Sequence, residues 1–159
     1  MEEDRKKGVR NRDPRGPHPD PKPPQMELPF ADDPEFKKRV VRYPDIPLVE
    51  LVPGSNSHLF FGDRITVSFL TMAAGSYFPP HRHESEQIMI VLDGYADEIV
   101  ENKLYRLQKG DVMLLPSNVE HGAYLREVDC RVIDIFSPPR EDFREKFMKA
   151  TGKTKEGKN

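Results

Sequence analysis

From residue 47 onward the chain is a series of short apolar runs with alternating side chains, and this pattern restricts the fold more than any other feature. A period of two residues places successive side chains on opposite faces of a β-strand. Turn-forming residues separate the runs, for example at 53–56, 93–94 and 116–118. Many short strands at regular spacing predict an all-β sandwich or barrel over residues 47–139.

The segments on either side of the expected barrel differ from it in composition. Residues 1–28 mix proline with both signs of charge, so they cannot bury enough apolar surface to offset the entropy of ordering them. We expect a proline-rich arm there, either disordered or wrapped around a partner subunit. Residues 29–46 are expected to form a bridge to the barrel, residues 140–151 a short C-terminal helix, and residues 152–159 a polar tail.

Charge and cysteine content exclude several classes of protein. The formal net charge of -2 gives no electrostatic reason to bind nucleic acid or an anionic membrane. With one cysteine, the chain can form neither an intrachain disulfide nor a zinc site built from several cysteines. The N-terminus is charged, and no apolar run reaches the ~18 residues needed to span a membrane. We therefore expect a cytoplasmic protein whose partner is a small molecule.

The sequence HRHESEQ, residues 81–87, places His81, His83 and Gln87 at odd-numbered positions. On one continuous strand these side chains would share a face and could converge inside a barrel. A fourth ligand must come from another strand, and His121, which follows its own turn, is the best candidate. Three imidazole nitrogens and an amide oxygen suit one divalent transition metal, with zinc or nickel first and iron, manganese, cobalt and copper as alternatives.

An amide at the fourth position changes the chemistry expected of such a metal. A carboxylate would lower the charge of the site by one unit, whereas Gln87 leaves the full charge on the metal. That charge favours a Lewis acid that polarises a substrate oxygen or acidifies a bound water. Glu86 remains an alternative ligand to Gln87, although it would need a bulge in the strand to reach the face of the histidines.

A second group of candidate site residues lies in the run VIDIFSPPR, residues 132–140. Asp134 and Phe136 share one face of the predicted strand with Val132, which puts an acid among apolar neighbours. Burial raises the pKa of such a carboxyl and suits it to general acid–base catalysis. Arg140 follows two prolines at the rim, where its guanidinium can hold a substrate carboxylate, and Phe136 would supply an apolar wall.

The spacing of glycines and histidines around these residues resembles both signature motifs of the cupin superfamily. The first motif is matched by Gly75, His81, His83 and Gly94, with Gln87 where the family usually has glutamate. The second is matched by Gly110, Pro116 and His121, with Asn118 where the family usually has glycine. The resemblance covers residues 64–137 directly. It implies a single-domain metal cupin: a double-stranded β-helix, or jelly-roll barrel, with a metal at its heart, and usually a homodimer.

A narrower likeness involves HESEQ, PSNVEHGA and DIFSPPREDF, which together are similar to the pectin-degradation cupins. The likeness implies that a 4,5-unsaturated uronate is hydrated and ring-opened to a 5-keto-4-deoxyuronate, a lyase or hydratase reaction of uronate catabolism. It also implies that the metal ligands are His81, His83, Gln87 and His121. The catalytic residues that it implies are Asp134, Phe136 and Arg140. Two alternatives stay open: a metal-dependent dioxygenase or other oxidoreductase cupin, and a cupin that binds a sugar acid without turnover.

Overall fold

The computed structural model describes residues 29–152, which belong to two units divided between Lys38 and Arg39. The arm predicted over residues 1–28 and all but the first residue of the predicted polar tail lie outside the described residues. Helix α1 (Asp33–Arg39) begins after Asp32. The side chain of Asp32 accepts a hydrogen bond from the backbone N–H of Glu35 at 2.9 Å, and Glu35 accepts one from the backbone N–H of Asp32 at 3.2 Å. This reciprocal capping box fixes the start of the helix.

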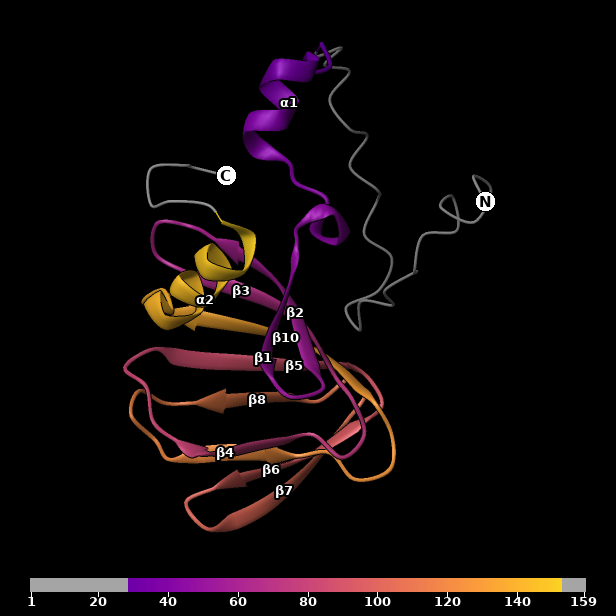
Figure 1. Cartoon of the computed structure of the whole chain (residues 1–159), viewed down its shortest axis with the longest axis vertical. Helices are drawn as coiled ribbons and strands as arrows, with labels where there is room; N and C mark the ends of the chain where they lie inside the picture. The colour runs from indigo at the N-terminus through magenta and orange to yellow at the C-terminus, as the bar shows by residue number, and fades with distance from the viewer. Residues whose placement is uncertain (1–28, 153–159) are drawn as a thin grey trace, which may run out of the picture. The chain divides into compact units, whose positions relative to one another are not determined.

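The second unit contains two antiparallel sheets that face each other (Figure 1). Along the six-stranded sheet, the order is β1 (Leu48–Val52), β2 (Ser55–Phe61), β3 (Thr66–Met72), β10 (Cys130–Ser137), β5 (Glu86–Asp93) and β8 (Val112–Leu115). Along the four-stranded sheet, the order is β4 (Tyr77–His81), β9 (His121–Tyr124), β6 (Tyr95–Val100) and β7 (Lys103–Gln108). A short 3-10 helix, η2 (Tyr43–Asp45), precedes the first strand. The all-β prediction is therefore confirmed.

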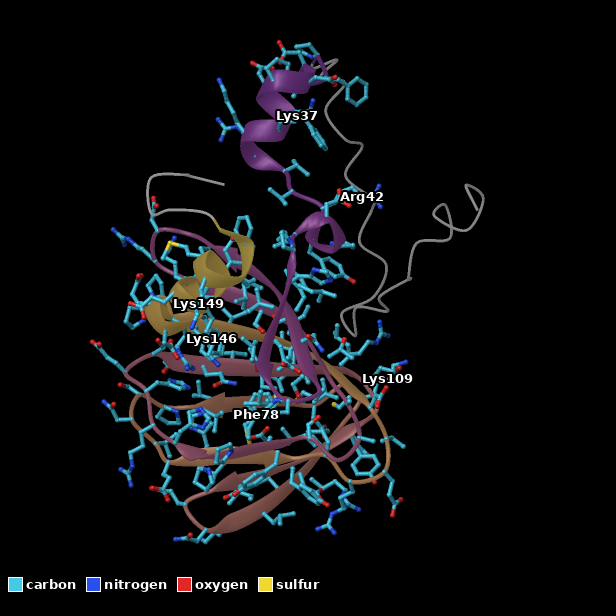
Figure 2. The ribbon with its side chains drawn as sticks, viewed as in Figure 1. Lys37, Arg42, Phe78, Lys109, Lys146 and Lys149 are labelled. Carbon is cyan, nitrogen blue, oxygen red and sulfur yellow. The ribbon has the colours of Figure 1, made fainter. Side chains whose placement is uncertain are left out.

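Alternation along the strands produces the core. In β2, β3 and β10, every second side chain is buried, as expected for strands with one face turned inward. The buried apolar side chains come from both sheets and meet between them, and Phe78 of β4 packs against this cluster (Figure 2). β4 and β5 follow each other in sequence but belong to opposite sheets, so the segment between them crosses from one sheet to the other.

Helix α2 (Glu141–Thr151) follows β10 and packs on β1 and β2 (Figure 1). Phe147 is buried and meets the ring of Phe61 edge-on, with ring centroids 5.7 Å apart. Lys146 Nζ donates a hydrogen bond to the backbone oxygen of Leu51 at 2.6 Å. The helix ends at Gly152, whose φ of 68° lies in the left-handed region that glycine adopts without strain. Arg140, which immediately precedes α2, is thereby held at the edge of the barrel interior.

The outward face of the six-stranded sheet is apolar over β5 and β8. Its exposed large side chains include Ile88, Leu92, Val112 and Leu114. Ile88 lies opposite Leu114 in the strand register, so these side chains form a continuous patch. Residues 29–152 include no helix with both the length and the apolar character needed to cross a bilayer.

Candidate metal centre and active-site pocket

Three histidines meet at one end of the barrel. His81 ends β4, His121 begins β9, and the strand register pairs the two residues. The ring centroids of His81 and His83 lie 4.5 and 4.8 Å from that of His121. One candidate ligand atom from each ring lies within 4.8 Å of the others, so the group could hold a metal ion.

The route by which these residues converge differs from the one expected from the sequence. A continuous strand through His81, His83 and Gln87 was predicted, and this prediction is wrong. His81 belongs to the four-stranded sheet, Gln87 belongs to the six-stranded sheet, and His83 lies in the loop between them. The chain crosses from one sheet to the other over residues 82–85, so the side chains approach the same point from facing walls of the barrel.

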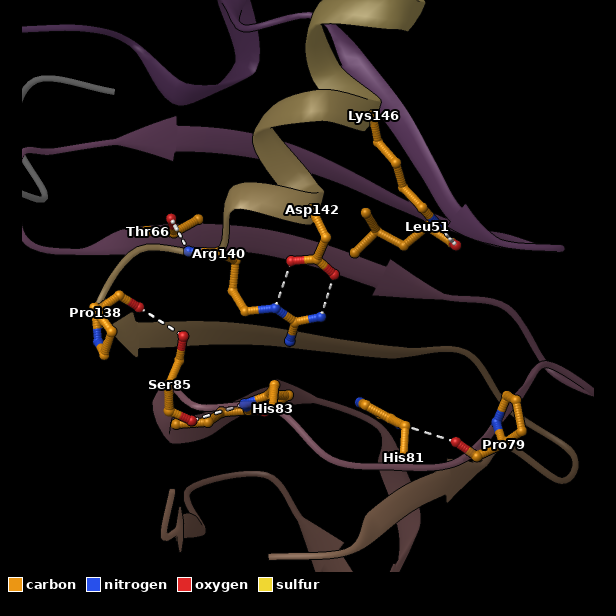
Figure 3. Close-up of polar contacts among 11 residues, drawn as sticks. Leu51, Thr66, Pro79, His81, His83, Ser85, Pro138, Arg140, Asp142 and Lys146 are labelled. Carbon is orange, nitrogen blue, oxygen red and sulfur yellow. Dashed lines mark hydrogen bonds and ion pairs between the residues drawn. The ribbon is translucent and has the colours of Figure 1, made fainter. Parts of the chain in front are cut away.

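Backbone carbonyls fix the orientation of all three rings. Because a carbonyl oxygen only accepts hydrogen bonds, each Nδ1 carries the proton, and the lone pair of each neutral ring is left on Nε2. This tautomer is the one that supplies Nε2 to a metal. The Nδ1 atoms of His81, His83 and His121 donate to the backbone oxygens of Pro79, Ser85 and Val119 at 2.9, 2.7 and 3.0 Å, the first two contacts being drawn in Figure 3.

The environment favours the neutral form of His83 and His121. Burial, followed by the charges of His81, His83 and Arg140, lowers the pKa of His121 to about 4, against the raising effect of the hydrogen bond to the Val119 backbone oxygen. Burial also lowers the pKa of His83, followed by the positive charge of Arg140. Metal ions bind the neutral form of histidine, so these shifts leave the rings ready to coordinate at neutral pH.

Gln87 connects the histidines to the buried acid Asp134. Its side-chain Nε2 donates a hydrogen bond to Oδ1 of Asp134 at 2.9 Å, which turns Oε1 toward Nε2 of His83 at 3.2 Å. Oε1 of Gln87 is an acceptor, and so is Nε2 of His83 when the ring is neutral. A cation beside the two atoms would therefore satisfy a lone pair of each. The donor set therefore fits a divalent transition metal. Glu86, the alternative ligand, is exposed on the opposite face of β5.

A cavity of about 50 Å³ extends from this group into the barrel. Its walls include His81, Gln87, Asp134, Phe136 and Arg140. Burial raises the pKa of Asp134 to about 7, against the lowering effects of the Gln87 hydrogen bond and the Arg140 charge. A carboxyl with a pKa near neutrality can both give and take a proton.

Arg140 lines the same cavity and is already engaged. Its Nε and Nη2 donate to Oδ1 and Oδ2 of Asp142 at 2.8 and 2.6 Å. The guanidinium carbon also lies 4.1 Å from the ring centroid of Phe143 and 5.1 Å from that of Phe136. Figure 3 shows the third guanidinium nitrogen turned away from Asp142, on the side of the histidines. Asp142 thus binds the two guanidinium nitrogens that we expected, from the sequence, to bind a substrate carboxylate.

Comparison with known proteins now identifies the family. The family model for the Cupin domain matches residues 68–136. KdgF from Halomonas sp. is 30% identical to the chain, and the two structures match over 61% of this chain and 90% of that chain, with a TM-score of 0.57. The chain belongs to the cupin family.

A second solved structure shares the fold, and a curated relative matches part of the sequence. An RmlC-like cupin from Shewanella frigidimarina shares the fold with a TM-score of 0.62, at 24% identity over 66% of this cupin and 95% of that chain. H2HPP isomerase from Bacillus subtilis is 30% identical over 93 residues, which are 57% of this cupin. This cupin spans 39% of the length of that curated relative. The predicted double-stranded β-helix is confirmed by these matches.

The cupin barrel contains one further acid that the sequence interpretation missed. Glu98 of β6 is 1% exposed and lines the cavity together with Asp134. Burial, and then the charge of Asp134, raise the pKa of Glu98 to about 8. A signal was present in the sequence, because Asp97 and Glu98 are consecutive in the run YADEIV and a strand must point one of two adjacent acids inward.

Proposed function

We propose that this cupin linearises 4,5-unsaturated uronate monosaccharides to 5-keto-4-deoxyuronates. The observation that carries the proposal is the composition of one cavity, which brings together a possible metal-binding group, a buried acid and an arginine. An anionic cyclic enol ether needs those three functions: a site for its oxygens, a proton donor and a cation. The sequence likeness to the pectin-degradation cupins and the 30% identity to KdgF support this substrate class.

The ligands proposed for the metal are His81, His83, Gln87 and His121. The converging lone pairs of the three rings and of Gln87 Oε1 support this set, whereas the exposed Glu86 lies on the other face of its strand. A bound divalent metal would supply Lewis acidity toward the substrate oxygens. The amide ligand leaves the charge of such a centre undiminished, which favours this role.

The catalytic residues proposed are Asp134, Phe136 and Arg140. Asp134 holds a proton near neutral pH and is oriented by its hydrogen bond from Gln87. Phe136 packs edge-on against His83, with ring centroids 5.6 Å apart, and excludes water from that wall. Arg140 would attract the substrate carboxylate with the guanidinium nitrogen that Asp142 does not engage.

These roles give a balanced reaction. A proton is transferred to C4 of the C4=C5 double bond, and the electron deficiency that results at C5 is stabilised by the ring oxygen. Water adds at C5 and gives up a proton, so that the proton taken from the protein is returned to it. The cyclic hemiketal then opens: the C5 hydroxyl loses its proton to form the ketone, and the ring oxygen leaves C5, takes up a proton and stays on C1 as a hydroxyl. The resulting C1 hydrate releases one water to give the aldehyde, so the water added at C5 is balanced and the net reaction is an isomerisation. No oxidant or reductant is consumed.

Non-redox chemistry is also favoured by the curated relative, since H2HPP isomerase is named as an enzyme that rearranges its substrate. Isomerisation and hydration both depend on proton transfer without net oxidation. Oxygen-dependent turnover and binding without turnover remain alternative outcomes that the same assay distinguishes.

The decisive experiment uses unsaturated galacturonate and the zinc- or nickel-loaded protein. We expect absorbance from the conjugated double bond to disappear and the 5-keto product to appear by NMR. Asp134→Asn should retain its metal and lose at least about 100-fold in kcat, because it cannot transfer the proton. Asp63→Asn, the same change at an exposed turn, should match the wild type.

The outcomes separate the three functions. Activity within a few-fold of wild type in Asp134→Asn would remove this residue from the mechanism. Oxygen consumption that requires iron or manganese would instead indicate a dioxygenase. Tight uronate binding with neither product formation nor oxygen consumption would indicate a binding protein.

A further inference from the structure

Glu98 occupies a defined layer of the barrel interior. In the strand register it lies opposite Ala123, whereas Val100 lies opposite His121. On the facing sheet, Asp134 lies opposite Met89, whereas Phe136 lies opposite Gln87. Each acid thus lies two residues along its strand from the residue that is opposite His121 or Gln87. Two acids from opposite sheets therefore line the same cavity.

Within the described part of the chain, one carboxyl oxygen of Glu98, Oε1, lacks the hydrogen-bond partner that a buried acid requires. Among residues 29–152, no hydrogen-bond partner is found for its buried Oε1. The adjacent residue Asp97 shows the contrast, because it is equally buried but accepts hydrogen bonds from Arg106 and Arg126 at 2.6 to 2.9 Å. Those hydrogen bonds lower the pKa of Asp97 to about 2, whereas burial raises that of Glu98. Only Asp97 is provided with cationic partners by the fold.

A role in folding does not account for this side chain. Burying a carboxyl without a hydrogen-bond partner opposes folding, and an apolar side chain of similar size would fill the same space without that cost. A buried polar atom that is unsatisfied and aimed into a cavity instead indicates a partner supplied by what binds there.

We infer that Glu98 is a ligand-contacting residue, whose carboxyl hydrogen-bonds a hydroxyl group of the molecule bound in the cavity. A hydroxyl can donate to one carboxyl and accept from another, so it can bridge Glu98 and Asp134 where an anionic group would be repelled. The carboxylate of the same ligand belongs near Arg140, outside the acid layer. The cavity therefore has a cationic side at Arg140 and an acidic side at Glu98 and Asp134. It selects a molecule that carries an anion at one end and a hydroxyl at the other.

This inference rests on the proposed function, because an uronate is the substrate class that carries both groups. Its test measures binding rather than turnover, with saturated D-galacturonate titrated calorimetrically into the metal-loaded protein. We expect Glu98→Gln, which keeps a hydrogen-bonding group, to bind within about 3-fold of wild type. Glu98→Leu should bind at least about 10-fold more weakly, which corresponds to the loss of a hydrogen bond to a buried polar group. Glu145→Gln, the same amide change on exposed helix α2, should leave binding unchanged.

Thermal unfolding and metal content separate ligand contact from a structural role. Glu98→Leu should keep its metal and unfold at a temperature no lower than that of the wild type, since it removes an unsatisfied buried acid. Binding by Glu98→Leu equal to that of wild type, or a lower unfolding temperature for this variant, would overturn the inference.

The wild-type results distinguish this inference from the proposed function. Wild-type protein that binds D-galacturonate but does not convert unsaturated galacturonate refutes the proposed reaction and leaves the Glu98 contact intact. Conversion by the wild type together with undiminished binding by Glu98→Leu refutes the contact and leaves the reaction intact. Wild-type protein that does neither refutes both.

Discussion

Gln87 has two roles that depend on the two ends of one amide. Its Nε2 donates to Asp134, and its Oε1 is thereby turned toward His83. An aspartate or glutamate at this position would face Asp134 with a second negative charge and could not donate a hydrogen bond to it. The amide therefore links the possible metal-binding group to the proposed acid without adding charge.

Removal of His121 tests the metal site at the level of one residue. We predict that His121→Ala lowers metal affinity by more than about 10-fold, because it removes the ring nearest to both other histidines. Elemental analysis of protein purified without an affinity tag measures this loss.

The matched control is His58→Ala. His58 lies on β2, where Nδ1 contacts the backbone oxygen of Ile46 and the ring meets Tyr43, outside the three-histidine group. Its replacement should leave the metal content unchanged. Equal metal content in His121→Ala and wild type would show that His121 is not a ligand.

Among the elements, β4 approaches β9 closely at Gly122, the residue next to the pair of His81 and His121. Gly122 permits this approach, because a Cβ atom there would lie 2.5 Å from the backbone oxygen of Phe78 and 3.0 Å from the backbone nitrogen of Pro80. Contacts of that length to backbone atoms cannot be relieved by turning a side chain. The distance between the two strands is therefore fixed by a residue that has no side chain.

We predict that Gly122→Ala destabilises the fold by about 1–3 kcal/mol and weakens metal binding by about 10-fold, because the strands must separate and carry the histidines with them. Chemical denaturation and metal titration measure the two effects. Gly62→Ala is the control, since the added Cβ meets a flexible side-chain atom of Ile65 at 3.3 Å. Wild-type metal affinity in Gly122→Ala would contradict the dependence of the site on this strand spacing.

The elements also show what the sequence could and could not predict. Alternation and turn residues were sufficient for an all-β fold, because the buried face of each strand is encoded locally. The sheet change between His81 and Gln87 was not predictable from alternation, since strand pairing involves residues far apart in sequence. Asp142 was missed for a similar reason: its contact with Arg140 depends on how α2 begins, which spacing alone does not define.

At the scale of the whole molecule, the outward face of the six-stranded sheet is the feature that needs a partner. Leu114 and Val112 on its edge strand are 57% and 64% exposed, and Ile88 and Leu92 extend the patch onto β5. Exposed apolar patches of this kind mark interaction sites. The sequence likeness to cupins implies a homodimer, and this face is the one we expect a second copy to cover.

We predict that the protein forms a homodimer through this face and that Leu114→Lys makes it monomeric, because two-fold symmetry places the introduced charge in the interface twice. Light scattering coupled to gel filtration measures the mass of each species. Leu104→Lys, on β7 of the other sheet and 58% exposed, should leave the mass unchanged. A monomeric wild type, or a dimeric Leu114→Lys variant, would contradict the assignment of this face.

The bracing of the three imidazoles by backbone oxygens has a consequence for protein engineering. Every amino acid supplies the same main-chain oxygen, so substitutions at Ser85 or Val119 that preserve the loop path would leave each ring aimed as it is. Exchange of the amide at position 87 for another donor can then alter metal preference while the three rings keep their orientation. The barrel is therefore a suitable scaffold for artificial metalloenzymes, because the backbone orients the imidazole rings independently of the neighbouring side chains.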